Sequence, residues 1–148
     1  MIQLVKWYPD QIARHWTVLS PTIEFTLPPI ASNKEDRMDK VLESLLCGKL
    51  ELYVAYDDSS EDHLLYGILV TAVTEALDSS DKALLVYSLY GYKKTTMEQV
   101  DNVLDGVKKI AIKEGCSMIN AYTTVPHLIA LLKSKGWNTD YTYVRVEV

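Results

Sequence analysis

The stretch KALLVYSLYGYKKTTMEQVDNVLDGVKKIAIKEGCSMINAYT, residues 82–123, decides the fold that we predict. Its two ends, residues 82–91 and 116–123, have the apolar and β-branched character of strands. Between them, apolar side chains recur at helical spacing at Met97, Val100, Leu104, Val107 and Ala111. A strand, a helix and a second strand in this order predict a crossover between two parallel strands of one sheet.

Two further strands are expected immediately before this unit. Residues 50–57 and 63–77 alternate with period two, and polar turns follow them at DDSSED and DSSD. Three strands joined by short polar turns predict an antiparallel meander. The meander and the crossover together predict a mixed sheet.

The N-terminal third predicts one short strand and two helices. Residues 2–8 favour the strand. Residues 9–25 carry apolar side chains at helical spacing, and Pro21 is expected to end or kink that helix. Residues 32–50 have the clearest apolar stripe, and Gly48 is expected to end the second helix.

The C-terminal third predicts a short helix and a final strand. Residues 125–136 form the helix, with a proline in the first turn and Gly136 after the last. Residues 137–148 alternate and favour a strand. The predicted order is β-α-α-β-β-β-α-β-α-β, an α/β (α+β) class with helices on both faces of the sheet, in one domain spanning residues 1–148.

Composition excludes several classes of function. The formal net charge of −5 argues against a dedicated nucleic-acid surface. No apolar run reaches the roughly 18 residues of a membrane span, and the N-terminus lacks the pattern of a signal peptide. Cys47 and Cys116 have no CxxC partner, so two buried thiols in a reducing compartment are expected. These features predict a cytoplasmic protein with no membrane or nucleic-acid partner.

Short motifs exclude other chemistries. The three histidines are scattered, and no HExxH or Cys/His cluster indicates zinc. The sequence lacks the GxSxG of hydrolases and the GxxxxGK[ST] of nucleotide triphosphate sites. The acidic run DDSSED does not have the spacing of a calcium loop. We therefore expect no metal cofactor.

The end of the chain resembles a segment of a known family. It reads EGCSMINAYTTVPHLIALLKSKGW, residues 114–137, and contains a leucine-rich helix that ends in Lys135, Gly136 and the aromatic Trp137. This segment is similar to the fifth strand and fourth helix of the GNAT superfamily of N-acyltransferases. The predicted element order resembles that family over nearly the whole chain, which implies a GNAT-like fold.

The resemblance also implies a site for acetyl-CoA. In the family, the cofactor lies where two central strands diverge, and its pyrophosphate rests on the amides that open the next helix. In this chain the two strands are residues 83–90 and 116–122. Free amides and the positive end of a helix bind anions in general. The cofactor-binding residues implied in this way are Tyr90, Gly91, Tyr92, Lys93, Lys94, Thr95 and Thr96.

This turn departs from the phosphate loop of the family. Gly91 is present, but no second glycine follows at the family's spacing, and Lys94 carries a side chain where the family prefers none. One interpretation is a well-capped helix start, in which Thr95 and Glu98 form a capping box. The alternative is a phosphate cradle in which Lys93 and Lys94 supply the charge.

The catalytic positions depart from the family as well. Many members carry a tyrosine as general acid four residues before the closing glycine, and Leu132 stands there. The strand at residues 83–90 contains no carboxylate to serve as a base, and Glu75 is expected at its opposite end. The remaining weak candidates for catalysis are His63, Tyr122 and His127.

Two functions follow from the resemblance. One is a binding or structural protein that keeps the GNAT scaffold and has lost catalytic residues, similar to small GNAT-like proteins of tailed phages, some of which are virion components. The other is an active acetyl-CoA-dependent N-acetyltransferase. The alternating Tyr141 and Tyr143 suggest an interface with a protein partner, or an edge strand that pairs with a second copy in a homodimer.

Overall fold

The computed structural model describes residues 1–28, 35–59 and 65–148. The strands are β1 (Ile2–Trp7), β2 (Glu51–Asp57), β3 (Leu65–Glu75), β4 (Lys82–Gly91) and β5 (Met118–Ala121). The helices are α1 (Pro9–Arg14), α2 (Trp16–Thr26), α3 (Arg37–Cys47), α4 (Met97–Lys113) and α5 (Pro126–Ser134). Within these ranges, no helix has the length and apolar character needed to cross a membrane.

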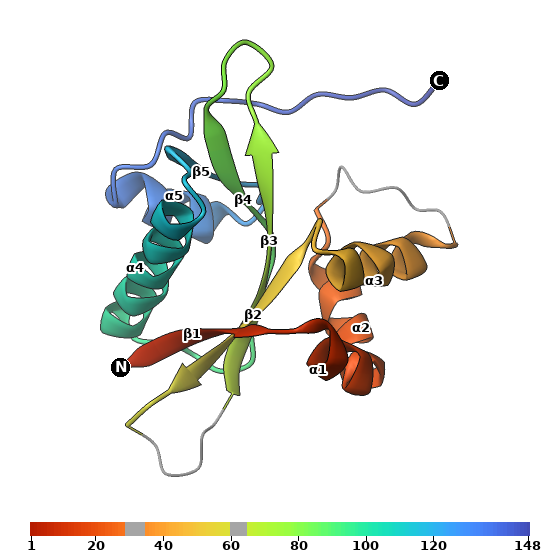
Figure 1. The fold of residues 1–148 in the computed structure, drawn as a ribbon. Coiled ribbons are helices and arrows are strands. Elements are labelled where there is room, and N and C mark those ends of the chain that lie inside the picture. The colour runs from red at the N-terminus through yellow and green to blue at the C-terminus, as the bar shows by residue number, and fades with distance from the viewer. Residues whose placement is uncertain (29–34, 60–64) are drawn as a thin grey trace.

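The strands form one mixed sheet in the order β1-β2-β3-β4-β5 (Figure 1). Neighbours from β1 to β4 are antiparallel, which confirms the predicted meander. β5 runs parallel to β4, because α4 crosses over between them. The predicted mixed sheet and fold class are therefore confirmed.

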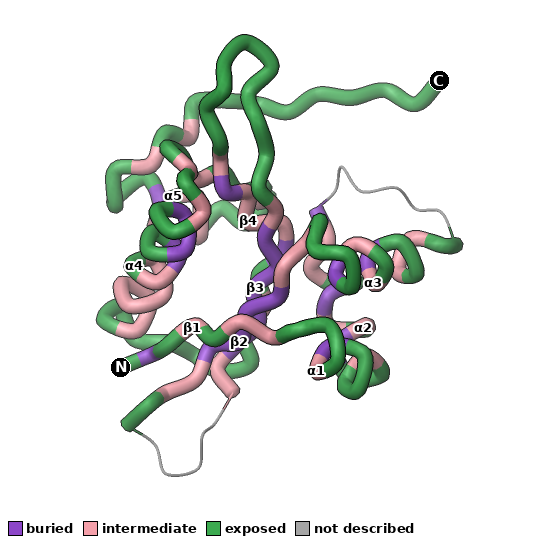
Figure 2. The backbone as a smooth tube through the Cα atoms, in the orientation of Figure 1, coloured by how far each residue is buried: buried purple, intermediate pink, exposed green. Residues whose placement is uncertain are grey.

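Helices cover both faces of this sheet (Figure 1). On one face, α1, α2 and α3 enclose a core with the central strands, whose buried residues are Ile12, Leu19, Ile23, Val41, Leu45, Leu52, Val54, Ile68 and Val70. On the other face, α4 packs against the sheet around Tyr53, Leu69, Leu84, Val107, Ile110 and Ala111. Figure 2 shows that buried residues concentrate in β2 and β3, between the two helical layers.

The first predicted helix is interrupted at His15, and Pro21 does not end it. His15 has φ −106° and ψ 11° and separates α1 from α2, whereas Pro21 lies inside α2. Pro21 is exposed, so water can satisfy the carbonyl that loses its helical hydrogen bond. The interruption allows α2 to direct Leu19 and Ile23 into the core.

The second predicted helix begins later than expected and ends where expected. α3 begins at Arg37 with Asp36 as its N-cap, and the expected residues 32–34 lie outside the described part of the chain. Gly48 ends α3 at φ 87°, as predicted, because a left-handed residue closes a helix most easily when it is glycine.

Cys47 is exposed, so the expectation that both thiols are buried was wrong.

The predicted final strand is absent. Residues 137–148 form no helix or strand and are largely exposed, including Tyr141 and Val146. Alternation shows that a segment suits a strand, but a strand also needs a neighbour with which to exchange hydrogen bonds. The order in the structure therefore ends on α5.

Candidate functional site

β4 and β5 are paired over only part of β4. The paired residues run from Ala83 with Met118 to Val86 with Ala121, and β4 continues to Gly91 without β5 beside it. Main-chain groups on that side of β4 beyond Val86 thus have no ladder partner from β5. The ladder between β4 and β5 therefore ends at Val86 and Ala121, where β5 itself ends.

A β-bulge in β4 lies directly after the last residue pair of the ladder between β4 and β5. Val70 pairs with Ser88 and Thr71 with Val86, so Tyr87 has no partner of its own on β3. A bulge of this kind bends a strand and increases its twist. Ser88 is buried, and its hydroxyl hydrogen-bonds that of Thr26, the last residue of α2. The end of α2 is thereby tied to the bulged part of β4.

The turn after β4 is held by β3. The Tyr92 amide donates to the Tyr66 carbonyl at 2.8 Å, and the Lys93 ammonium lies 5.3 Å from the centre of the Tyr66 ring. Gly91 is open, since a Cβ placed on it would have no neighbour closer than the Lys93 carbonyl oxygen at 3.7 Å. The backbone at Gly91 is therefore accessible to a ligand.

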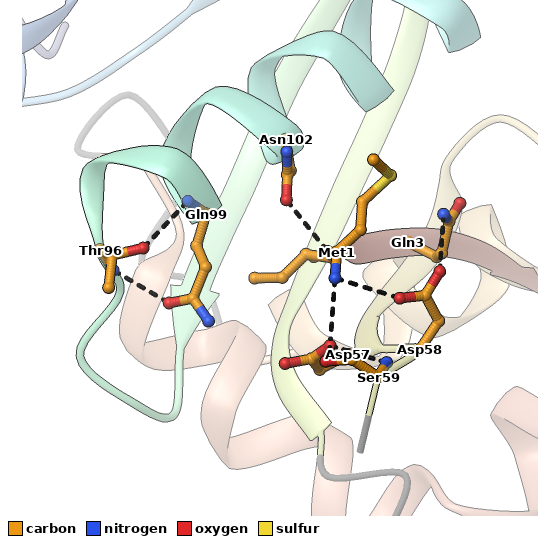
Figure 3. A network of polar contacts seen from close by, with 9 residues as sticks. Met1, Gln3, Asp57, Asp58, Ser59, Thr96, Gln99 and Asn102 are labelled. Carbon is orange, nitrogen blue, oxygen red and sulfur yellow. Dashed lines mark hydrogen bonds and ion pairs between the residues drawn. The ribbon is translucent and has the colours of Figure 1, made fainter.

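A capping box closes the start of α4, but it uses a different pair from the predicted Thr95 and Glu98. The Gln99 amide donates to Thr96 Oγ1 at 3.2 Å, and the Thr96 amide donates to Gln99 Oε1 at 2.9 Å (Figure 3). The prediction was wrong by one residue because the helix begins at Met97. The cap uses two main-chain amides that a phosphate would otherwise find free.

The position of this cap gives a first testable prediction. Thr96→Ala removes the acceptor for the Gln99 amide and is expected to cost about 1 kcal/mol of the free energy of unfolding. Thr95→Ala, one residue earlier and exposed, is the matched control and is expected to change it by less than about 0.5 kcal/mol. Urea unfolding of both variants makes the measurement, and an equal or larger loss for Thr95→Ala would contradict the assigned cap.

A polar network around Asn102 links the first turns of α4 to β1 and to the end of β2. Asn102 Oδ1 accepts from the Ile2 amide at 3.2 Å, which links α4 to β1 (Figure 3). The amino group of Met1 in turn contacts Asp57 at 3.3 Å and Asp58 at 3.1 Å. Hydrogen bonds from Ser59 hold the pKa of Asp57 below its usual value, and the Met1 amine does the same for Asp58.

The structure gathers part of the predicted cofactor set with residues that the sequence did not indicate. The rings of Tyr90 and Tyr92 lie 5.0 Å apart, and Phe25 of α2 lies 6.1 Å from Tyr90. These three rings form what we call the aromatic surface: Phe25, Tyr90 and Tyr92. Phe25 was missed because it comes from α2, and no local pattern links it to β4.

The two candidate catalytic residues that the structure describes, Tyr122 and His127, lie on different segments. His63 lies outside the described residues. Tyr122 follows β5, and its ring lies 6.3 Å from that of Tyr143, whereas His127 is exposed in the first turn of α5. Glu75 pairs with Lys82, at the end of β4 opposite to Gly91, as expected. The catalytic roles of Tyr122 and His127 remain predictions.

A second polar cluster lies on β1 and β2. Glu51 accepts from Lys6 Nζ at 3.2 Å and from the Tyr53 hydroxyl at 3.1 Å. Burial, and then the negative charge of Glu51, raise the pKa of Tyr53, so this tyrosine is a neutral donor at ordinary pH. Across the described ranges, no three His, Cys, Asp or Glu side chains gather as a metal site would require.

Comparison with known proteins bears on the fold. No family model matches the chain, and no curated protein matches it. An aminoglycoside acetyltransferase from an uncultured soil metagenomic sample superposes with a TM-score of 0.68 at 15% identity, over 100% of this chain and 99% of that one. The chain has a GNAT-like fold.

Two other acetyltransferase structures have folds similar to that of this chain. The ribosomal-protein-alanine N-acetyltransferase from Brucella melitensis biovar Abortus 2308 has a TM-score of 0.67 at 14% identity, and each chain is fully covered. AAC(6')-Iy, in complex with the bisubstrate analogue CoA-S-monomethyl-acetylneamine, has a TM-score of 0.66 at 11% identity, over 100% of this chain and 99% of that one. At these identities the likeness shows a shared fold.

Proposed function

We propose that this GNAT-like protein acts by binding a partner and has lost part of the catalytic apparatus of the acyltransferases that share its fold. The observation that carries the proposal is Leu132. Its side chain is buried at 9% exposure on α5, at the position where the resemblance implies a general-acid tyrosine. An aliphatic side chain has no proton to donate to a leaving thiolate.

The carboxyl end of β4 supports the same proposal. β4 carries no Asp, Glu or His between Ala83 and Gly91, so it offers no base to accept a proton from an amine. The capping box at Thr96 also engages amides that would otherwise face a pyrophosphate.

The aromatic surface is suited to binding. Phe25 is 81% exposed and Tyr92 is 39% exposed, although the ring of each lies against that of Tyr90. Exposed aromatic rings that are held in place by their neighbours contribute strongly to protein interfaces, because they bury much area at little entropic cost.

The test is an assay for free CoA thiol with acetyl-CoA and a panel of amines, including polyamines, aminoglycosides and peptide N-termini. We expect no thiol release above the uncatalysed rate, since Leu132 cannot serve as the acid and β4 offers no base. Sustained turnover that Tyr122→Phe or His127→Ala abolishes would overturn the proposal and assign catalysis to those residues.

An acetyl-CoA-dependent N-acetyltransferase is the second candidate, and the part of β4 beyond Val86 that β5 leaves unpaired favours it. The residues present fit a phosphate group, because Gly91 leaves its backbone open and Lys93 and Lys94 are exposed beside it. Acetyl-CoA would supply the acyl group. Tyr90 to Thr96 would hold its phosphates and adjoining chain.

The two lysines give a direct prediction for this candidate. Calorimetry with acetyl-CoA measures the affinity, and the doubly substituted Lys93→Ala, Lys94→Ala protein is expected to bind about 5 to 10 times more weakly, or about 1 kcal/mol. Each lysine that contacts a phosphate contributes a charge-assisted hydrogen bond, which the alanines remove.

Lys108 and Lys109 provide the matched control. They are an exposed lysine pair in the second half of α4, away from the turn at Gly91, so their double alanine variant changes net charge equally. Equal losses for the two variants would mean that the phosphates do not rest on the turn. Affinity for acetyl-CoA no tighter than about 1 mM would exclude this candidate.

The partner in this binding role would be an assembly of which the protein is one component, as the resemblance to small GNAT-like phage proteins implies. In a purified particle from the source of this chain, mass spectrometry is expected to find the protein in fixed stoichiometry with the other components. If the protein is absent from every purified particle, it is not a component of an assembly, and the proposed binding role would then concern a partner outside any particle.

A further inference from the structure

We propose that the outer edge of β1 is a docking site for an extended acidic peptide of a partner protein, which adds a strand to the sheet there. The proposal goes beyond the proposed function and does not depend on it, because it concerns β1 and not the aromatic surface or the turn after β4. Three features carry it: an open row of main-chain groups, an apolar hollow at the end of that row and lysines beside it.

The main-chain groups of alternate residues of β1 face away from the sheet. β1 is the first strand in the order of the sheet and pairs only with β2. The Met1 carbonyl accepts a hydrogen bond from the Asp58 amide. Because successive residues of a strand alternate, the main-chain groups of Ile2, Leu4 and Lys6 then face the outer side. Among the described residues, the main chain of Leu4 and that of Lys6 have no partner there.

Helix α4 closes this edge at one end. Asn102 Oδ1 accepts from the Ile2 amide at 3.2 Å (Figure 3). One turn further along α4, a Cβ on Gly106 would lie 2.8 Å from Cδ1 of Leu4. Figure 1 shows β1 at the border of the sheet, running from the side of α4 to α1. The open stretch therefore comprises Leu4 and Lys6, and a strand edge of this kind favours pairing with another strand.

A small apolar hollow lies where this open stretch ends. It has a volume of about 210 Å³, and its lining includes Lys6, Trp7, Tyr8, Ile12, Leu45 and Leu50. Sites for small molecules usually measure roughly 300 to 1,000 Å³, so this hollow suits a single apolar side chain instead. A peptide strand advances about 3.3 Å per residue, so one that pairs with Leu4 and Lys6 brings its next side chains to the hollow. Peptide recognition by strand addition combines main-chain hydrogen bonds with pockets of this kind.

Two lysines of α4 lie along the same edge. Residues three and four apart share one face of a helix, so Lys109 and Lys113 continue the row that Asn102 and Gly106 begin. The first two members of that row are level with Ile2 and Leu4, and both lysines are exposed. The open edge of β1 is therefore flanked by positive charge.

This charge selects the occupant. The Lys6 ammonium donates to Glu51 Oε1 at 3.2 Å, and with three N–H donors it can hold a second carboxylate. A second copy of this chain, paired edge to edge, would bring Lys6, Lys109 and Lys113 against their own counterparts, and like charges repel. A peptide that carries glutamate or aspartate meets the same lysines with opposite charge, so an acidic peptide fits the edge and a second copy does not.

The test titrates the full chain with synthetic peptides of about ten residues, in which valine alternates with glutamate and either end carries leucine, phenylalanine or tryptophan. NMR spectra of the protein amides locate the contact. We expect the amide signals of Leu4 and Lys6 to shift and their hydrogen exchange to slow about tenfold or more, because they enter main-chain hydrogen bonds. Replacing the apolar end residue of the peptide by serine is expected to weaken binding about fivefold.

Two neighbouring lysines supply a matched pair of variants. Lys109→Glu is expected to weaken binding of the glutamate peptides about fivefold, because it places a carboxylate beside them. Lys108→Glu makes the same change in net charge on a residue that points about 100° away around α4, so its affinity is expected to stay within about twofold of the unaltered chain. Both lysines are exposed, so neither variant removes packing from the core.

Several outcomes would overturn the proposal. They are an absence of shifts at Leu4 and Lys6 at about 1 mM peptide, shifts confined to the aromatic surface, and equal losses for the two lysine variants. Equal affinity for peptides with lysine in place of glutamate would also overturn it, since the charge would then select nothing. A dimer of the protein alone that pairs through Leu4 and Lys6 would assign the edge to a second copy.

Discussion

Gly67→Ala is expected to lower the free energy of unfolding by about 3 kcal/mol, since it introduces a methyl group where there is no space. A Cβ on Gly67 would overlap the main-chain carbonyl oxygen of Tyr90 and lie 3.4 Å from the Gly91 Cα. These are backbone atoms on the paired strand, so no side-chain rotation relieves the overlap. β3 and β4 would have to separate where they position the turn at Gly91.

Gly91→Ala is the matched control, because Gly91 is the register partner of Gly67. A Cβ there meets nothing closer than 3.7 Å, and Gly91 is not among the glycines with positive φ. Its substitution is expected to change stability by less than about 1 kcal/mol. Urea unfolding of both variants provides the comparison. If the two variants lose the same stability, the close approach of β3 and β4 at Gly67 is not what requires glycine.

Leu52→Ala is expected to cost about 2 to 5 kcal/mol of the free energy of unfolding. Leu52 is fully buried in β2, within the core beneath α1, α2 and α3. Truncation removes apolar contacts and leaves a cavity that the surrounding sheet and helices fill only in part. The free energy of unfolding of a small domain is about 5 to 15 kcal/mol in total, so this single change removes a large share of the stability.

Leu46→Ala tests the same chemical change at the surface. Leu46 lies on α3 and is 42% exposed, so its loss is expected to cost less than about 1 kcal/mol. Thermal and urea unfolding of both variants measures the difference. A Leu52→Ala protein as stable as Leu46→Ala would mean that the core beneath α2 is not closely packed.

Local patterns were sufficient to predict most elements. β4 spans Lys82–Gly91, as its period-two pattern indicated, and Gly48, Gly115 and Gly136 end their helices at positive φ. These features depend on the conformational preferences of a few neighbouring residues, which a sequence displays directly. The meander and the crossover followed from them, because short turns impose antiparallel pairing and a crossover helix allows parallel pairing.

The candidate site was predictable only in outline. The sequence placed Gly91 at the end of β4 and Lys93 just after it, and the resemblance implied that the neighbouring strands separate there. The unopposed Tyr87, the hydroxyl pair of Thr26 and Ser88 and the exposed Phe25 beside Tyr90 were not predictable. Each depends on contact between elements distant in sequence, for which a local pattern carries no signal.

The sequence by itself indicated most of the helices and strands, and it showed that residues 137–148 have the pattern of a strand. The tertiary structure alone decided that, among the described residues, β5 pairs with β4 as far as Val86 and residues 137–148 pair with no strand. The physical reason is that strand propensity belongs to a single segment, whereas a hydrogen-bonded ladder belongs to two. Whether the second segment is within reach depends on how the whole chain packs.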